Sequence, residues 1–363
     1  MMKIQTPAIV IDLPVVERNI RRMAEYVKQH NLKLRPHTKT HKLRFMAEKQ
    51  MAAGAIGLTV AKVGELEVMQ DEAEELLLGY PVADESRAAR VVQTAGRKRI
   101  LVALDSTYSA ELLSQAAQRE DVLIGILVDQ DVGYHRTGVQ DAQSALELAQ
   151  FVEQQPNLYL EGLFIYPGHL STIEPRQQAV QLEKISTVVK ETLDLWKRNN
   201  LSSRIVSGGS TPTAYQSHLI PELTEIRPGT YIYNDMNCVR SGVCGLEDCA
   251  AAIVCTVISN AVPGKVILDA GSKTLTSDRL SPNPEEGGHG LILEYPEARI
   301  VRLSEEHGEV DVSMLSKAPR LGEHVHVIPN HICPCINLQN EVWIRQDDGT
   351  LERVQVDARG MLT

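Results

Sequence analysis

The sequence lacks three features that mark large classes of proteins: an excess of basic residues, a long apolar run, and any cysteine before residue 238. Asp and Glu number 47 against 37 Lys and Arg, which gives a formal net charge of −10. No basic stripe and no interleaving of basic with aromatic residues occurs, so we expect no nucleic-acid partner. No run could span a bilayer and no charged leader with an apolar core opens the chain, so we expect no membrane association and a cytoplasmic location.

The six cysteines stand at 238, 244, 249, 255, 333 and 335. Small secreted domains that depend on disulfides carry cysteines along their whole length, so this distribution predicts reduced thiols. The chain has 363 residues, which is more than one barrel requires. We therefore expect a second domain of about 120 residues.

Eight short apolar segments alternate with amphipathic stretches between residues 32 and 229. The predicted strands, each rich in Val, Ile, Leu or Tyr, are 32–36, 55–60, 76–80, 100–104, 122–129, 158–166, 204–207 and 223–227. The stretches between them include 141–151 and 177–196, where apolar residues recur at helical spacing. This pattern predicts a closed (β/α)₈ barrel, an α/β fold whose working face lies at the carboxyl ends of the strands. Before the barrel, residues 7–11 form a further predicted strand, and Asp12 can cap the helix that follows.

The pattern changes past residue 235, where short β-branched segments are separated by turn formers. The predicted strands of this region are 251–259, 265–269, 289–294, 298–304, 324–328 and 341–345, and Asp348-Gly349 predicts a hairpin between the last two strands. These segments predict a mostly antiparallel β domain. By the change of period we place the barrel at residues 1–240 and the β domain at 241–363.

Chemically functional residues follow the predicted barrel strands. Lys39 follows the first strand, and a lysine at a barrel mouth can form a Schiff base. The loops after the seventh and eighth strands, 207–211 and 227–231, are rich in glycine and hydroxyl groups. Such loops suit a phosphate, because glycine lets the chain approach closely and the backbone N–H groups act as donors. A lysine and a phosphate cradle at one barrel mouth are the layout that pyridoxal phosphate requires.

His331 and Cys333 give the β domain a second chemical signal. In an extended segment, residues two apart point to the same side, so the imidazole and the thiolate would converge on one ion. Histidine and cysteine together favour zinc over calcium or magnesium. Two other interpretations stay open: a structural zinc whose four ligands are completed from three nearby candidates, or a buried thiol beside a satisfied histidine. The three candidates are Cys335, His324 and His326.

Eight motifs, taken in order, resemble one family. They are RPHTKTHK, DVGYHRTG, YPGH, SGGSTPT, IRPGTY, DAGSK, LSEEHG and PNHICP. The set is similar to that of the D-threonine aldolase and D-serine dehydratase family, which are fold type III pyridoxal-phosphate enzymes with an alanine-racemase-like barrel and a β domain. The resemblance runs from about residue 5 to about residue 360. It implies a homodimeric enzyme that acts on small β-hydroxy-D-amino acids with pyridoxal 5'-phosphate and a divalent metal.

The resemblance also implies roles for four residues at the barrel mouth. Lys39 corresponds to the lysine that carries the cofactor, and the alternative is a surface lysine. Arg136 corresponds to an arginine that contacts the phenolic oxygen of the cofactor, and the alternative is a salt bridge with Asp131. His169 corresponds to a histidine that accepts the proton of the substrate hydroxyl, against a satisfied polar histidine. Tyr166 lines the cofactor pocket or fills the core.

The residues named for the cofactor phosphate come from the two glycine-bearing loops. They are Gly208, Gly209, Ser210, Thr211, Gly229, Thr230 and Tyr231, and the alternative is that the glycines only make turns. Arg227 corresponds to an arginine that faces the pyridine nitrogen in alanine racemases, and the alternative is an arginine that holds the barrel rim. The segments with Asp269 and His307 also match family motifs, but no catalytic role can be derived for them, and a place at a domain interface is the simpler interpretation.

Two reactions are compatible with these residues. Retro-aldol cleavage would give glycine and an aldehyde, and dehydration would give a keto acid and ammonia; a Lewis-acid metal serves both. Within the resemblance, aldolases tend to carry aspartate where Cys333 stands and dehydratases tend to carry cysteine, whereas IRPGTY and YPGH are closer to the aldolases. A thiolate favours zinc over manganese or magnesium. We expect a D-threonine aldolase-like lyase, with a D-serine dehydratase-like lyase as the alternative. An amino-acid racemase or a non-catalytic cofactor-binding protein is the second alternative.

Overall fold

The computed structural model describes residues 4–173, 175–279 and 287–363, which divide into two compact units. The barrel unit holds residues 21–39, 44–229 and 361–363. The β unit holds the described residues within 1–20, 40–43 and 230–360. The division between residues 240 and 241 remains a prediction. Residues 8–12 depart from it, because they pair with strands of the β unit.

The barrel unit contains eight parallel strands among the described residues. They are β2 (Lys33–Leu34), β3 (Leu58–Val60), β4 (Glu75–Leu78), β5 (Arg99–Leu104), β6 (Ile124–Gln130), β7 (Leu158–Ile165), β8 (Ile205–Gly208) and β9 (Glu225–Ile226). Their order is β2-β9-β8-β7-β6-β5-β4-β3, and a parallel bridge between His37 and Thr59 joins the two ends. The predicted (β/α)₈ barrel and all eight of its strands are confirmed.

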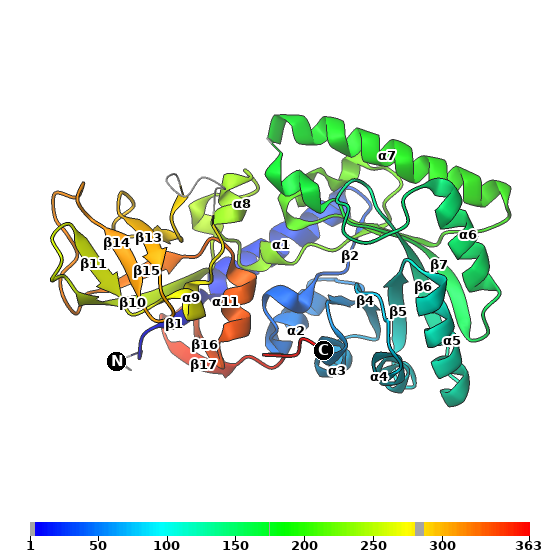
Figure 1. Cartoon of the computed structure of the whole chain (residues 1–363), viewed down its shortest axis with the longest axis horizontal. Helices are drawn as coiled ribbons and strands as arrows, with labels where there is room; N and C mark the ends of the chain where they lie inside the picture. The colour runs from blue at the N-terminus through cyan, green and yellow to red at the C-terminus, as the bar shows by residue number, and fades with distance from the viewer. Residues whose placement is uncertain (1–3, 174, 280–286) are drawn as a thin grey trace. The chain divides into compact units, whose positions relative to one another are not determined.

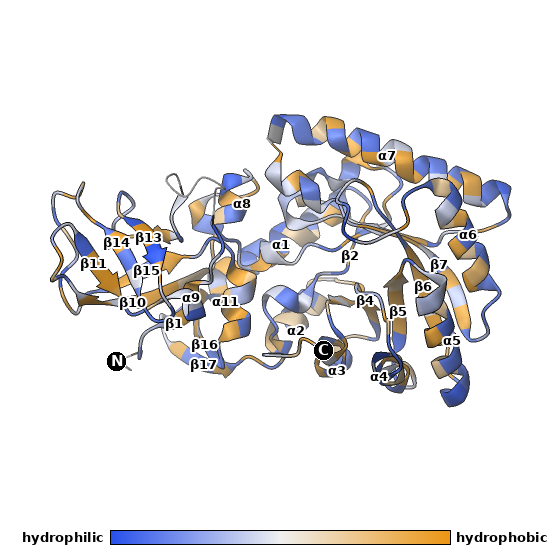
Figure 2. Ribbon diagram, in the orientation of Figure 1, coloured by the Kyte–Doolittle hydropathy of each residue, from blue (hydrophilic) through white to orange (hydrophobic). Residues whose placement is uncertain are grey.

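Helices cover the outside of the barrel strands, as Figure 1 shows for α4 to α7. The helices that follow strands of the barrel are α2 (Arg44–Ala52), α3 (Val63–Met69), α4 (Glu85–Ala95), α5 (Thr107–Glu120), α6 (Ala142–Glu153) and α7 (Pro175–Arg198). Asp84, Ser106 and Asp141 cap α4, α5 and α6 by accepting a backbone N–H three residues on. Along α7, hydrophilic and hydrophobic residues alternate at the helical period (Figure 2), and Leu182, Ile185, Val189 and Trp196 are buried. None of the described helices has the length and apolar character needed to cross a bilayer.

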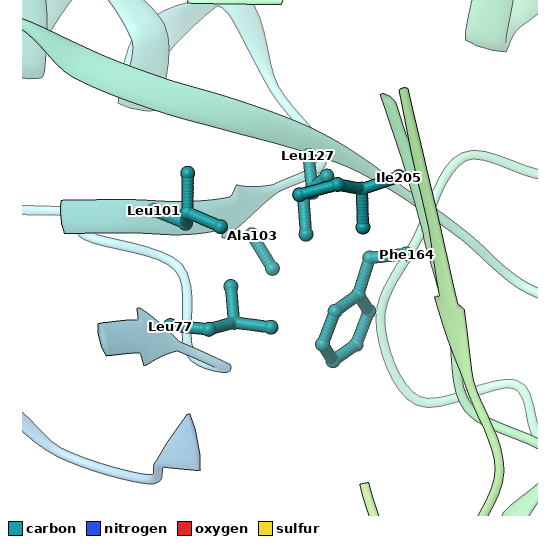
Figure 3. Close-up of a cluster of buried hydrophobic side chains, with 6 residues drawn as sticks. All are labelled: Leu77, Leu101, Ala103, Leu127, Phe164 and Ile205. Carbon is teal, nitrogen blue, oxygen red and sulfur yellow. The ribbon is translucent and has the colours of Figure 1, made fainter. Parts of the chain in front are cut away.

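The middle of the barrel interior is an apolar layer. Leu77, Leu101, Ala103, Leu127, Phe164 and Ile205 point toward one another from five strands (Figure 3). Because side chains alternate along a strand, the residues two positions earlier face the same interior. Glu75 and Arg99 therefore lie at the amino ends of β4 and β5, inside the barrel, while Asp129 lies two positions after Leu127. The interior thus has a charged layer at the amino ends, an apolar layer, and a polar layer at the carboxyl ends.

A β-bulge in β7 changes which side chains of this strand face the barrel interior. The register to β6 shifts so that Leu160 pairs with Ile126 and Gly162 with Leu127, which leaves Glu161 as the extra residue. Glu161 and Phe164, three positions apart, then both face the interior, where Glu161 accepts hydrogen bonds from Arg99 and Arg204. Gly162 has a φ of +148°, and a Cβ there would clash with the carbonyl oxygen of Ile205. Glycine is thus required at residue 162.

The β unit contains a nine-stranded sheet among the described residues. Its strands are β1 (Ala8–Asp12), β10 (Ala251–Ser259), β11 (Lys265–Leu268), β12 (Leu291–Ile292), β13 (Arg299–Leu303), β14 (Gly308–Asp311), β15 (His324–Ile328), β16 (Glu341–Arg345) and β17 (Leu351–Gln355). All pairs are antiparallel except β1 with β16. The predicted β domain is confirmed, but β14 was not predicted, because its four residues Gly-Glu-Val-Asp have a single strongly apolar side chain.

Short helices complete the β unit. They are α1 (Leu13–Gln29), which continues into the barrel unit, α8 (Met236–Arg240), α9 (Ser272–Leu275) and α11 (Ile332–Leu338). As predicted, Asp12 caps α1 by accepting the N–H of Val15 at 3.2 Å. Asp269 accepts hydrogen bonds from the hydroxyl of Thr6 at 2.6 Å and the N–H of Thr256 at 2.8 Å, so its contacts lie within this unit.

The bulge gives a prediction about stability. Gly162→Ala should lower the free energy of unfolding in urea by about 1–3 kcal/mol beyond the cost of its positive φ, because the new Cβ overlaps a neighbouring backbone. Gly54→Ala is the matched control, since Gly54 also has a positive φ, +97°, but nothing lies within 4 Å of a Cβ there. Equal losses in the two variants would contradict the role given to the bulge.

Candidate functional site

Lys39 lies in the segment that follows β2, within a 3₁₀ turn over Thr38–Thr40. Its backbone N–H points to Nδ1 of His37 at 3.4 Å, which ties the turn to the preceding residue. Within the described residues, Nζ of Lys39 forms no hydrogen bond and no ion pair, and the side chain is half-buried. A half-buried amine without a partner at the carboxyl mouth of the barrel is available to a ligand.

The loop after β6 is organised by Asp131. Its Oδ1 accepts the N–H groups of Gly133, Tyr134 and His135 at 2.9–3.1 Å, and its Oδ2 lies 2.7 Å from Nδ1 of His135. Although burial opposes ionisation, these donors hold the pKa of Asp131 below its usual value. The carboxylate therefore acts as the fixed centre of the loop.

Arg136 contacts aromatic rings. Its guanidinium lies 4.7 Å from the ring centroid of Tyr166 and 5.1 Å from that of Tyr134, and the two rings meet edge to face. Asp131 is occupied by the loop N–H groups and His135, so the alternative of an Arg136–Asp131 salt bridge is wrong. The stack holds Arg136 at the mouth by cation–π contact, with its charge uncompensated by that carboxylate. Tyr166 also packs against the apolar layer, which agrees with the core-filling alternative, and its place in a cofactor pocket remains a prediction.

His169 follows β7 in the 3₁₀ segment Gly168–Thr172. It lies against the Asp131 loop, because a Cβ at Gly133 would be 3.3 Å from Cε1 and Nε2 of its ring. Nδ1 is buried and has no hydrogen-bond partner among the described residues, so the alternative of a satisfied polar histidine is contradicted. Burial lowers the pKa of His169, which favours the neutral imidazole that a general base needs.

Arg227 is buried and belongs to a chain of hydrogen bonds through the barrel. It donates to Oγ of Ser207 at 2.5 Å and to the carbonyl of Ile165 at 2.8 Å, and it lies 3.7 Å over the ring of Phe164. Ser207 in turn donates to Glu225 at 2.6 Å. Burial lowers the pKa of Arg227 to about 10, which leaves it charged at neutral pH. These contacts join three strands, as the rim-holding alternative required, and the role at the pyridine nitrogen remains a prediction.

Asp129 is a titratable group that the sequence analysis did not single out. It lies at the carboxyl end of β6, is 6% exposed, and accepts a hydrogen bond from the Thr137 hydroxyl at 2.8 Å. Burial raises the pKa of Asp129 to about 6, and Asp105 adds to the shift while Arg227 opposes it. Nothing in its sequence context marked this residue; the alternation from Leu127 was the one available signal.

The loop after β8, predicted to bind a phosphate, contains a tight turn at Gly209. Gly209 has a φ of +75°, and Ser210 is the N-cap of the 3₁₀ segment Thr211–Leu219 but makes no side-chain cap. A Cβ at Gly209 would lie 3.1 Å from Ile226, so glycine lets this turn pack closely on β9. Gly208 and Gly229 also belong to the barrel unit, whereas Thr230 and Tyr231 belong to the β unit. The hydroxyl of Thr230 lies 3.6 Å from the sulfur of Cys333.

In the β unit, His331, Cys333 and Asp235 lie together. Nδ1 of His331 is 3.1 Å from Oδ2 of the fully buried Asp235, whose Oδ1 caps α8 through the N–H of Cys238. The side chains of His331 and Cys333 are in hydrogen-bond contact, and the thiolate form of Cys333, followed by Asp235, raises the pKa of His331 to about 11. With Nδ1 held by a carboxylate, the other ring nitrogen is the one left for a metal, which would have to displace the proton that this raised pKa keeps on the ring.

The local geometry at His331 differs from the prediction. His331 is the extended N-cap of α11, and Cys333 lies in the first turn of that helix, so the argument from an extended strand was wrong although the side chains do meet. The structural-zinc interpretation is also wrong within the described residues, where no three His, Cys, Asp or Glu side chains could hold a metal. Cys335 donates to the carbonyl of His331, and His326 pairs with Glu294 at 2.5 Å.

Both implied groups fit the residues present. For pyridoxal phosphate, the unpartnered Lys39, the Arg136 stack and the turn at Gly209 supply an amine, a cation and a close backbone approach. For a metal, His331 and Cys333 supply two donors, and Asp235 supplies the second hydrogen bond of the histidine. Asp235 was missed because it is 96 residues from His331 in the chain.

A parallel barrel with an available lysine at its carboxyl mouth, joined in one chain to an antiparallel sheet, is the architecture of alanine-racemase-like enzymes, which use pyridoxal phosphate. The chain belongs to this family: the alanine racemase N-terminal domain matches residues 11–237, and a serine dehydratase domain matches residues 250–344.

Full-length relatives include enzymes of two kinds. The chain is 30% identical to a D-threonine aldolase from Filomicrobium marinum, whose crystal structure matches with a TM-score of 0.91 over 99% of this chain and 97% of that one. It is 29% identical to a D-threonine aldolase from Arthrobacter sp, over 99% of this chain and 93% of the relative. The D-threo-3-hydroxyaspartate dehydratase from Delftia sp. HT23 is 26% identical, with a TM-score of 0.89 over 97% of each chain. A cysteine-to-alanine mutant of D-threo-3-hydroxyaspartate dehydratase is described in a metal-free form.

The buried carboxyl of Asp129 predicts a pH dependence of stability. Its pKa of about 6 in the folded chain lies above the value of about 3.9 in an unfolded chain. Between these values the folded state keeps a proton that the unfolded state has lost, so stability should fall by up to about 3 kcal/mol as pH rises from 4 to 6.

The test compares unfolding free energies between pH 4 and 7. Asp129→Asn cannot titrate and should lack this fall, whereas Asp347→Asn, at an exposed position of the last hairpin, should keep the wild-type profile. An unchanged profile in Asp129→Asn would place the titration elsewhere.

Proposed function

We propose that this protein is a lyase that acts on β-hydroxy-D-amino acids with pyridoxal 5'-phosphate and a divalent metal, cleaving them as a D-threonine aldolase does to glycine and an aldehyde. The observation that carries the proposal is the contact between His331 and Cys333 with Asp235 on the other side of the imidazole. An amino-acid racemase has no use for such a pair of donors. A lyase uses a metal to stabilise the oxygen of the β-hydroxyl group.

Different residues of the chain would have different roles in the reaction. When bound, pyridoxal phosphate supplies an electron sink for the bond that breaks at Cα. Lys39 would hold the cofactor, and the loop at Gly208–Thr211 would bind its phosphate with Gly229, Thr230 and Tyr231. Arg136 would face its phenolic oxygen, beside Tyr166, and Arg227 would hold the barrel rim.

His169 is the proposed general base. Its buried Nδ1 lacks a partner and its lowered pKa keeps the ring neutral, so it can accept the proton of a substrate hydroxyl. His331 and Cys333 would hold the metal, which would supply Lewis-acid chemistry to either reaction. In an elimination, Lys39 would instead take the Cα proton.

A dehydratase is the second candidate, and Cys333 is the observation that favours it. D-threo-3-hydroxyaspartate dehydratase is among the full-length relatives, and its metal-free structure carries a cysteine-to-alanine substitution. The D-threonine aldolases match 99% of this chain, whereas the D-threo-3-hydroxyaspartate dehydratase matches 92–97% of it, so we place the aldolase first.

Three finer statements belong to the same proposal. The metal is zinc, because a thiolate donor is soft and a neighbouring histidine suits the same ion, whereas manganese and magnesium prefer oxygen. The enzyme is a homodimer, by resemblance to its family. It works in the cytoplasm on free small molecules, with neither nucleic acid nor membrane as a partner, and its six free cysteines agree with a reducing compartment.

Product analysis tests the proposed reaction. The protein loaded with cofactor and zinc is incubated with D-threonine and with D-serine, and glycine, acetaldehyde, ammonia and keto acids are measured. Glycine and acetaldehyde from D-threonine are the expected result. Ammonia with a keto acid would replace the aldolase by the dehydratase, and an activity that survives chelation and only inverts Cα would establish a racemase.

A pair of cysteine variants distinguishes loss of the metal from damage to the fold. Cys333→Ala should lose bound zinc, measured by elemental analysis, and with it at least about tenfold of the activity. Cys335→Ala removes a neighbouring buried thiol whose contact is the His331 carbonyl, so it should keep the zinc. Full zinc content in Cys333→Ala would contradict the metal site.

A further inference from the structure

A cavity lies at the amino-terminal mouth of the barrel, at the end of the strands opposite to Lys39. It has a volume of about 720 Å³, which is within the range of small-molecule sites. Its walls come from β2, β4, β5, β8, β9 and the segment 95–98 after α4. None of the residues proposed for the lyase reaction lines it.

Cationic side chains dominate the lining. Six of them are Lys33, Arg35, Arg97, Lys98, Arg99 and Arg204, against the three carboxylates of Glu74, Glu75 and Glu225. Glu161 stands behind them and pairs with Arg99 and Arg204, which makes four carboxylates. The cavity therefore carries an excess of two positive charges in a chain whose net charge is −10.

The carboxylates are already shared among four of the cations. Arg204, Glu161, Arg99, Glu75, Arg35 and Glu225 follow one another as a chain of ion pairs. Glu74 pairs with Lys98 at 2.9 Å. Among the described residues, the side chains of Lys33 and Arg97 have neither an ion pair nor a hydrogen bond, so their charges are uncompensated at the cavity wall.

Arg35 adds a buried donor that lacks an acceptor. Its side chain is fully buried, and Nε and Nη2 are engaged by Glu225 and Glu75 at 2.6–2.9 Å. The third nitrogen, Nη1, is buried and has no partner among the described residues. Because Nη1 lies against Gly57, Arg35 adds buried positive charge behind the wall. The exposed and unpaired side chains of Lys33 and Arg97 are the donors within reach of carboxylate or phosphate oxygens.

We propose that this mouth of the barrel is a binding site for a small, multiply charged anion, either a phosphoanhydride or a polycarboxylate. Lys33 and Arg97 bind the anion directly at the rim, and the buried charge of Arg35 lies behind them without contacting it. Both ligand classes offer the same chemistry, several closely spaced anionic oxygens, and the cavity volume suits a small molecule. The site is separate from the proposed lyase reaction and stands whether or not that reaction is correct.

Calorimetric titration of the full chain tests the site. The protein is saturated with pyridoxal phosphate, so that the other mouth of the barrel is not available, and titrated with pyrophosphate or with citrate at constant ionic strength. We expect saturable binding of one anion per chain. The stronger of the two ligands identifies the class, phosphoanhydride or polycarboxylate.

Matched variants decide whether the binding occurs in this cavity. The double variant Lys33→Gln, Arg97→Gln should lower the affinity for the anion by at least about tenfold, because two direct charge contacts are lost. Lys28→Gln with Lys184→Gln removes the same charge from exposed positions of α1 and α7 and should leave the affinity unchanged. Absence of saturable binding by both anions, or equal affinities in the two double variants, would overturn the proposal.

Discussion

The buried pair of Arg35 and Glu225 is the interaction on which the barrel interior depends. Burial by itself would lower the pKa of Arg35 and raise that of Glu225, but their mutual attraction reverses both shifts, so both groups stay charged. Removing one partner of such a pair costs about 3–5 kcal/mol, because the other charge is left without compensation. From this pair one chain of ion pairs runs around the amino-terminal mouth, and one chain of hydrogen bonds runs through Ser207 to Arg227.

In this arrangement, the charged groups of the barrel interior lie on two opposite sides of the apolar layer. The apolar layer of Leu77, Leu101 and Phe164 keeps water from the middle, so the charges on either side of it act in different environments. On the carboxyl side, Arg227 and Asp129 are held where burial shifts their pKa values, and the amine of Lys39 has no partner in the described part of the chain. Rigid strands thus position groups whose chemistry depends on their being desolvated. The amino side carries surplus positive charge, which suits a separate ligand.

The fold was largely predictable, because alternation and helical periodicity are local properties of the sequence. β14 was missed for lack of apolar residues, and α11 was taken for an extended segment although Pro334 stands in its first turn, where proline is tolerated. The positions of Lys39, Arg136, His169 and Arg227 at strand ends could also be read from the chain. Asp129, Asp235 and the Arg35–Glu225 pair could not, because their importance comes from partners up to 190 residues away and from burial.

The central claim is that the available amine of Lys39 at the carboxyl mouth holds the cofactor. The most direct measurement is reduction of the cofactor-loaded protein with borohydride, followed by proteolysis and mass spectrometry of the peptides. The account predicts the added mass of the reduced cofactor on Lys39, and its loss in Lys39→Ala. Label on Lys42, whose Nζ donates to the carbonyl of Ala358, or no label on any lysine, would contradict the account.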